Sequence, residues 1–213
     1  GEEVVVTQVA DVFDTFQRTV AAGGWGTASG GLPWLLGGGA AAERSVSAGR
    51  GVVTGSSATI SAVRIQALAG PLGDAEVRVR MSVPQVSTGA ALIPGVLLRY
   101  ADGSNYYRAR LHFNAGGTLS TSITRTVTQV GSAVAVSGGY TAGAEFEVRA
   151  RVDGHRIRMR VWPVGGTEPT IWHQDQTITS DPIEHGLVGV TAGGFAGNTN
   201  VDPQIRFDLF EAV

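Results

Sequence analysis

The sequence predicts an all-β protein, built as a two-sheet antiparallel β-sandwich. Clusters of its 31 glycines recur along the chain and separate short stretches rich in Val, Ile, Thr and aromatic residues. Regular turns between short β-prone runs are typical of sandwiches. Several runs also alternate apolar and polar residues with a period of two, as half-buried strands do. The clearest of these runs lie at residues 76–83, 96–100, 106–113, 145–152 and 156–162.

The strongest local signal is an Asp-Gly pair between two alternating runs. Asp153-Gly154 predicts a type I′ hairpin that pairs Val152 with His155. That register directs the apolar residues of both strands to one face and the charged residues to the other. It places Arg151 opposite Arg156 and, two residues further along each strand, Arg149 opposite Arg158.

Like charges directly opposite on a sheet are unfavourable. We therefore expect acidic groups close to these arginine pairs. Two explanations are open. Acidic residues of the same or adjacent strands, such as Glu145 and Glu147, can interleave with the arginines. Alternatively, the outer face binds an acidic polysaccharide or an acidic neighbouring protein chain, because guanidinium groups bind carboxylate and sulfate in a forked geometry.

Residues 101–104 (ADGS) predict a second, central hairpin, with Leu98 opposite Tyr107 and Arg99 opposite Tyr106. Alternation places the polar side chains of its second strand on one exposed face, where they can reach a ligand. We therefore predict a ligand-binding row made of Arg99, Tyr106, Arg108, Arg110 and His112.

Length and composition fit one folded domain. The chain of 213 residues is 43% hydrophobic and 16% charged, enough to build a sizeable core. We expect a single domain over residues 1–213, with residues 1–10 as a leading segment. The stretch 10–20 is rich in β-branched and aromatic residues, which favours an extended entry strand over a helical turn.

Charge and cysteine content exclude several classes of function. The net charge of −2 gives no general attraction to nucleic acid. No apolar run approaches the length of a membrane span, which is about 18 residues or more. The absence of cysteine removes disulfides and thiolate metal sites. All 16 basic residues are arginine, which suggests a GC-rich bacterial or bacteriophage genome.

Three segments of the sequence resemble parts of a known domain family. Residues 11–20 (DVFDTFQRTV), with Gly24-Trp25-Gly26 and Trp34, resemble the first strand and loop of concanavalin A-like jelly-roll domains of the lectin and glucanase (LamG-like) type, which occur in actinobacterial secreted proteins and actinobacteriophage tail proteins. Residues 95–110 resemble their central hairpin. Residues 188–191 and 205–210 resemble their closing strands, so the resemblance covers roughly residues 11–210.

This resemblance implies a jelly roll whose concave face binds glycans in many relatives. It also implies an extracellular or virion-associated location. In some relatives a closing aspartate joins the opening strand around a structural calcium ion, and the matching positions are Asp208 and Asp14. Calcium takes six to eight oxygen ligands, so backbone carbonyls would have to complete such a site.

No catalytic motif accompanies the resemblance. Glycoside hydrolases of this fold carry a Glu-x-Asp-x-Glu strand, because their chemistry requires two carboxylates close together, and that strand is absent. Glu145 and Glu147 share a face, but the neighbouring arginines would keep them ionised. The four histidines show no zinc-binding spacing. Neither a Gly-x-Ser-x-Gly elbow nor a phosphate loop occurs.

Aromatic rings can stack on the apolar side of a pyranose. The candidates for such stacking are Trp34, Tyr100, Tyr106 and Trp162, of which we assign Trp34 and Tyr106 to ligand binding, whereas Trp25 and Trp172 have the pattern of core residues. The sequence therefore predicts a non-catalytic module that recognises glycans or cell surfaces. The alternatives are a structural virion or tail module that packs on another protein chain and, more remotely, a glycoside hydrolase.

Overall fold

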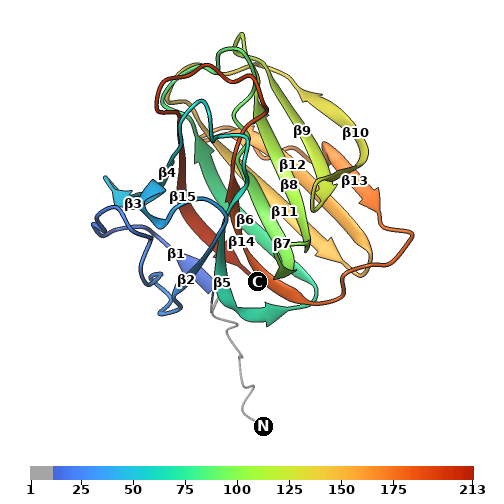
Figure 1. Cartoon of the computed structure of the whole chain (residues 1–213). Coiled ribbons are helices and arrows are strands. Elements are labelled where there is room, and N and C mark those ends of the chain that lie inside the picture. The colour runs from blue at the N-terminus through green and yellow to red at the C-terminus, as the bar shows by residue number, and fades with distance from the viewer. Residues whose placement is uncertain (1–11) are drawn as a thin grey trace.

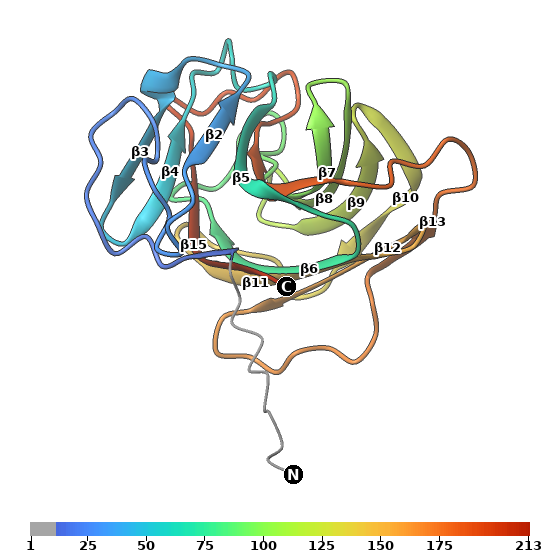
Figure 2. The same ribbon diagram turned by 90° about the horizontal axis from the view of Figure 1, so that it is seen from below.

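The computed structural model describes residues 12–213, which fold into two antiparallel sheets packed face to face (Figures 1 and 2). This confirms the predicted all-β jelly-roll sandwich. The predicted leading segment, 1–10, lies outside the described residues. Within them the only helix is a single 3₁₀ turn, Ala41–Glu43, and no helix has the length and hydropathy of a membrane span.

One sheet has eight strands and the other has seven. The order in the eight-stranded sheet is β13 (Gln174–Thr177), β12 (Arg156–Pro163), β11 (Glu145–Asp153), β6 (Ala75–Ser82), β15 (Gln204–Ala212), β4 (Arg50–Thr54) and β3 (Arg44–Ser47), with β1 (Val12–Asp14) paired to β15. The order in the seven-stranded sheet is β10 (Thr128–Val136), β9 (Leu119–Arg125), β8 (Asn105–Phe113), β7 (Gly95–Asp102), β14 (Gly186–Ala192), β5 (Arg64–Leu72) and β2 (Trp34–Gly37).

The core lies between the sheets and follows the alternation seen in the sequence. On β11 and β12, Val148 lies opposite Val161 and Ala150 opposite Met159, and all four side chains are buried. On β8 the inward set is Tyr107, Ala109, Leu111 and Phe113. Alternate residues are thereby directed outward, which confirms the predicted faces of both hairpins.

The register of the 145–163 hairpin differs from the prediction by two residues on β12. Asp153 pairs with Arg156, so the turn is Gly154-His155, and Gly154 takes the positive φ of +53° that such a turn requires. A shift of two residues preserves the side-chain faces, because side chains alternate with a period of two. The facing arginines are therefore Arg151 with Arg158, and Arg149 with Arg160.

The central hairpin is predicted correctly at its base and wrongly at its tip. Leu98 lies opposite Tyr107, as expected, but the register shifts between Leu98 and Asp102. Arg99 sits in this irregularity with φ of +48°, a left-handed conformation that turns its side chain away from the regular alternation. Arg99 is therefore not opposite Tyr106.

An aromatic cluster fills the core where β1, β2, β4 and β15 meet. Trp25 packs edge-on against the rings of Phe16, Trp34 and Phe207, with ring centroids 5.1 to 5.6 Å apart. Edge-to-face packing suits the opposite partial charges of ring edges and faces. The cluster thus joins the opening segment of the chain to its closing strand.

We expect Gly189→Ala to destabilise the sheet by about 1–3 kcal/mol, the usual cost of overpacking. Gly189 lies on β14 between β5 and β7, and an added Cβ would come within 2.0 Å of the Gln66 carbonyl oxygen. Gly103→Ala is the control, because no atom lies within 4 Å of a Cβ at that position. Urea unfolding followed by circular dichroism measures both. Equal unfolding midpoints for the two variants would contradict the packing of β14 between β5 and β7.

Candidate functional site

The candidate site is the outer face of the seven-stranded sheet, which we call the open face. It is the side of β8 that does not pack on the other sheet. Tyr106, Arg108, Arg110 and His112 occupy it at alternate positions, as predicted. On the neighbouring strands, Arg110 faces Gly95 of β7 and Ser122 of β9, while Arg108 faces Leu97 and Thr124.

The expectation that this row is well exposed to solvent is wrong. Arg108 and Arg110 are each 7% exposed, and His112 is 4% exposed. The ring of Phe195, from the loop that follows β14, lies edge-on to the His112 imidazole at 5.4 Å and 5.9 Å from the Arg110 guanidinium. Phe195 itself is 44% exposed, so an aromatic ring that the sequence analysis missed forms part of this face.

Apolar side chains cover the other end of the row. Ile65, Ala67, Leu97 and Tyr106 form a small buried cluster, separate from the main core, with the half-buried Tyr100 and Leu187 packed against it. The Tyr100 and Tyr106 rings lie 5.9 Å apart. The open face therefore has an apolar end at Tyr106 and a cationic end at Arg110.

Ser122 connects Arg110 to His112. Its Oγ accepts a hydrogen bond from Arg110 Nε at 2.9 Å and lies 2.8 Å from His112 Nε2. A hydroxyl has one proton and two acceptor lone pairs, so Ser122 can accept from Arg110 and also share a hydrogen bond with His112 Nε2 in either direction. The other ring nitrogen of His112, Nδ1, lies 3.3 Å from Ser120 Oγ.

The electrostatics of the row agree with a neutral imidazole between serines. Burial, followed by the nearby charges of Arg110 and Arg108, lowers the pKa of His112 to about 4. Burial, followed by the charge of Arg108, lowers the pKa of Arg110 to about 10, so this guanidinium remains charged at neutral pH. None of the strand positions flanking Arg108 and Arg110 on this face carries a carboxylate.

Two residues predicted to bind ligand lie elsewhere. Arg99 is buried at the edge of the sandwich, where it donates to the carbonyls of Gly73 and Ile183 and pairs with Asp74 at 2.9 Å. Trp34 is a core residue in the aromatic cluster, and its Nε1 donates to Asp14 Oδ2 at 2.7 Å. Both side chains are held by contacts within the fold, so neither is available for ligand stacking or ligand hydrogen bonds.

The geometry does not fit a calcium ion between Asp14 and Asp208. Asp14 points into the core and accepts hydrogen bonds from Arg18, Trp34 and the Phe16 amide. Burial alone would raise the pKa of Asp14, but these donors hold it below its ordinary value. Asp208 points outward from β15, opposite Arg80. Across residues 12–213, no group of three or more His, Asp or Glu side chains is placed to hold a metal.

The outer face of the eight-stranded sheet, which we call the ladder face, carries the arginine pairs. Glu147 lies between Arg78 and Arg80 and accepts a hydrogen bond from each Nε, at 3.0 and 2.9 Å. Glu168 lies 3.1 Å from Arg149 Nε and 2.5 Å from Arg160 Nη2. The first of the two explanations is therefore confirmed, because acidic residues of this chain interleave with the facing arginines.

Trp172 also belongs to the ladder face, and its expected place in the core is wrong. Its half-buried ring lies under two guanidinium groups, with Arg158 at 5.1 Å and Arg160 at 4.4 Å from the ring centroid. Stacking on an aromatic face favours arginine. Stacking on this ring is therefore a second interaction, besides pairing with acidic residues, that stabilises neighbouring arginines on the ladder face.

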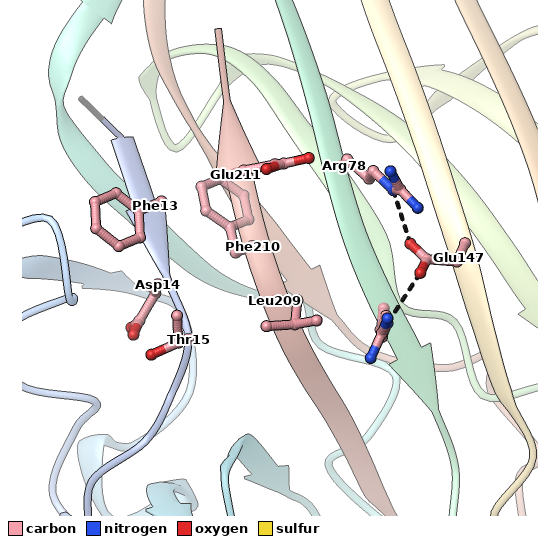
Figure 3. Close-up of a pocket in the computed structure, with 9 residues that line it drawn as sticks. Phe13, Asp14, Thr15, Arg78, Glu147, Leu209, Phe210 and Glu211 are labelled. Carbon is pink, nitrogen blue, oxygen red and sulfur yellow. Dashed lines mark hydrogen bonds and ion pairs between the residues drawn. The ribbon is translucent and has the colours of Figure 1, made fainter. Parts of the chain in front are cut away.

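A pocket of about 440 Å³ opens between β1, the irregular part of β15 and the ladder face (Figure 3). Phe13 and Leu209 line its apolar side, and the Glu147 carboxylate with its two arginine partners lines the other. Burial alone would raise the pKa of Glu147, but hydrogen bonds from Arg78 and Arg80 hold it below its ordinary value. Glu147 thus stays ionised and does not suit proton donation to a leaving group.

Comparison with known proteins shows that this chain has the same fold as several solved structures. No family model matches the sequence, and no curated protein matches it. A β-1,3-glucanase from Mycobacterium marinum superposes with a TM-score of 0.61 at 12% identity, covering 97% of this chain and 100% of that chain. A glycosyl hydrolase family protein from Mycobacterium fortuitum gives 0.60 at 12% identity, covering 95% and 98%.

A third similar structure is a family 16 glycosyl hydrolase from Mycobacterium smegmatis, with a TM-score of 0.56 at 11% identity, covering 95% of this chain and 99% of that chain. These structures share the concanavalin A-like jelly roll, which is therefore the structural class of this chain. Proteins with this fold over nearly the whole chain are named as glycan-cleaving enzymes. This finding contradicts the prediction of a non-catalytic recognition module.

The buried His112 predicts a pH dependence of stability. The unfolded chain protonates this imidazole below pH 6.5, whereas the folded chain keeps it neutral down to about pH 4. Because the unfolded state binds the extra proton in this interval, stability falls as the pH drops through it, by up to about 3 kcal/mol from this group. Urea unfolding from pH 7 to pH 4.5 should therefore show a shallower loss for His112→Gln than for the unchanged protein.

The control for this measurement is His155→Gln, because His155 lies on an exposed hairpin turn beside Glu184. It should retain the pH dependence of the unchanged protein. Carboxylates with lowered pKa, such as Asp14 and Glu147, add the same slope to all three proteins. Identical slopes for all three proteins would contradict a neutral, buried His112.

We expect Asp14→Asn to lower the free energy of unfolding by about 3 kcal/mol, because it leaves the Arg18 guanidinium without its buried counter-charge. Asp208→Asn should cost less than about 1 kcal/mol, since Asp208 is in no ion pair within the described chain and burial already raises its pKa. Urea unfolding with calcium and with EDTA measures both effects. A calcium-dependent gain in stability, lost in both variants, would show that the two carboxylates share an ion after all.

Proposed function

We propose that this chain is a glycan-active protein that takes a saccharide on its open face. The observation that carries the proposal is the combination on one face of an exposed aromatic ring, Phe195, with outward-directed polar donors, Arg108 and Arg110. A saccharide site needs both features. A ring covers the C–H side of a pyranose, and fixed polar groups bind its hydroxyls.

The similar structures support this proposal through their names alone: a β-1,3-glucanase and two glycosyl hydrolases have the same fold. The term glycan-active includes both binding and cleavage of a saccharide. Hydrolysis by paired carboxylates requires two such groups close together, and the strand positions that face Arg108 and Arg110 carry no carboxylate. Turnover is therefore measured separately from binding. The predicted extracellular or virion-associated location stays a prediction.

The test is binding of the full chain to an array of plant, fungal and bacterial polysaccharides, followed by titration calorimetry with the best oligosaccharide. We expect Phe195→Ala to weaken binding about threefold to tenfold, which corresponds to the loss of one stacking contact. Release of reducing ends from the same glycan, assayed in parallel, reports cleavage.

The matched control is Ile171→Ala, which removes an exposed apolar side chain from the loop beside the ladder face. It should bind as the unchanged protein does. Equal weakening in both variants would place the saccharide away from the open face. Failure of the unchanged protein to bind or cleave any glycan of the array would refute the proposed function.

A further inference from the structure

Four of the 16 arginines stand apart from the others in their partners. Twelve lie within 4.0 Å of a carboxylate oxygen of the described residues. The four without such a partner among the described residues are Arg44, Arg108, Arg110 and Arg206. The protein thus pairs its arginines as a rule, and exceptions need a physical explanation.

Neutral acceptors account for two of the exceptions. The Arg44 guanidinium donates to the carbonyls of Ala40, Gly37 and Gly38 at 2.6 to 2.9 Å. Arg206 donates through Nε and Nη2 to the side-chain oxygen of Gln204. Both are isolated from other unpaired cations.

Arg108 and Arg110 differ because they are adjacent on one face and mostly buried. Arg110 makes a single hydrogen bond within residues 12–213, from Nε to Ser122, which leaves both of its terminal nitrogens available. Arg108 bonds Thr124 and the Thr126 carbonyl through Nε and Nη2, which leaves Nη1 available. The acceptors are all neutral, so hydrogen bonds satisfy part of each guanidinium while its charge stays uncompensated.

Two like charges, each more than nine-tenths buried, are unfavourable without an opposite charge nearby. The strand positions beside Arg110 supply no such charge. Gly95 lies opposite Arg110 on β7, and Thr191 of β14 lies opposite Gly95. The cationic end of the open face is thus flanked by a position without a side chain and by a small hydroxyl.

We propose that Arg108 and Arg110 form a subsite for an anionic group of a glycan, a carboxylate or a sulfate, so that this protein acts on acidic saccharides. The guanidinium fork matches the paired oxygens of either group. Phe195, whose ring lies beside Arg110, would stack on the sugar that carries the charge. This inference deepens the proposed function and rests on it for the identity of the ligand as a glycan.

The test compares two matched oligosaccharides that differ only in charge. The probes are a β-1,4-linked glucuronic acid hexamer and the neutral hexamer obtained by reducing its carboxyl groups to hydroxymethyl groups. Titration calorimetry on the full chain should show at least about tenfold tighter binding of the acidic probe, as charged hydrogen bonds predict. Raising the salt concentration should weaken only the acidic probe. A hexamer sulfated at its primary hydroxyls tests the second anion.

Arg110→Gln and Arg108→Gln should each remove most of the preference for acidic probes, because each should weaken the acidic probe far more than the neutral one. Arg206→Gln is the matched control, since it removes another arginine without a carboxylate partner but from the ladder face. Each variant is checked for an unchanged unfolding midpoint. If Arg110→Gln fails to fold, Arg108→Gln and the salt dependence decide the question.

Inorganic sulfate separates this inference from the proposed function. It should raise the unfolding midpoint of the unchanged protein and of Arg206→Gln, and raise it less in Arg110→Gln. Stabilisation by sulfate without binding of any glycan would refute the proposed function and support the anion subsite. Equal binding of acidic and neutral probes, or a preference that persists in both Arg108→Gln and Arg110→Gln, would overturn the subsite and leave the proposed function standing.

Discussion

The register of β8 between β7 and β9 determines what this protein presents to a ligand. Four apolar side chains of β8, from Tyr107 to Phe113, fill the centre of the core. Strand geometry then requires the intervening residues to point outward. A slip of one residue would bury Arg108 and Arg110 between the sheets and expose the four apolar side chains instead. The cationic row is therefore fixed by the same packing that stabilises the sandwich.

The two outer faces accommodate arginine in opposite ways. On the ladder face, Glu147 and Glu168 each bridge two arginines, and Trp172 stacks under Arg160 and one further arginine, Arg158. On the open face the partners of Arg108 and Arg110 are hydroxyls and a carbonyl. Hydroxyls can accept a hydrogen bond but cannot cancel a charge. The facing arginine pairs of the ladder face therefore have acidic partners, whereas the adjacent Arg108 and Arg110 of the open face have only neutral acceptors.

The sequence was informative wherever a period of two extended over a whole strand. The five alternating runs correspond to β6, β7, β8, β11 and β12. The pairing of the Asp153-Gly154 hairpin was two residues out, because Gly154 occupies the first central position of the turn instead of the second. The predicted side-chain faces were still correct, because a shift of two residues keeps each side chain on the same side of the sheet. The interleaving of arginines with acids was likewise open to prediction from the sequence.

Positions outside regular strands could not be predicted in the same way. Arg99 follows the alternation in the sequence but lies in a register shift, so its side chain leaves the row. Trp34 looked available for stacking, and only the folded core brings it against Asp14, twenty residues earlier in the chain. Phe195 offered one signal: an aromatic residue within a glycine-rich loop has no strand face on which to be buried. Its place over Arg110 depends on where that loop returns, which alternation does not specify.

The surroundings of Ser122 also limit the chemistry that the open face can perform. Ser122 Oγ accepts a hydrogen bond from Arg110 and shares another with His112 Nε2, while burial and the nearby arginines lower the pKa of this imidazole to about 4. Such a ring does not serve as a proton donor at neutral pH, and its Nε2 is already engaged. His112 is therefore better understood as a positioning residue, which holds the Ser122 hydroxyl and, through it, the Arg110 fork. With His112 neutral at neutral pH and no carboxylate facing Arg108 and Arg110, this row supplies neither an imidazolium nor a carboxylic acid as proton donor for cleavage.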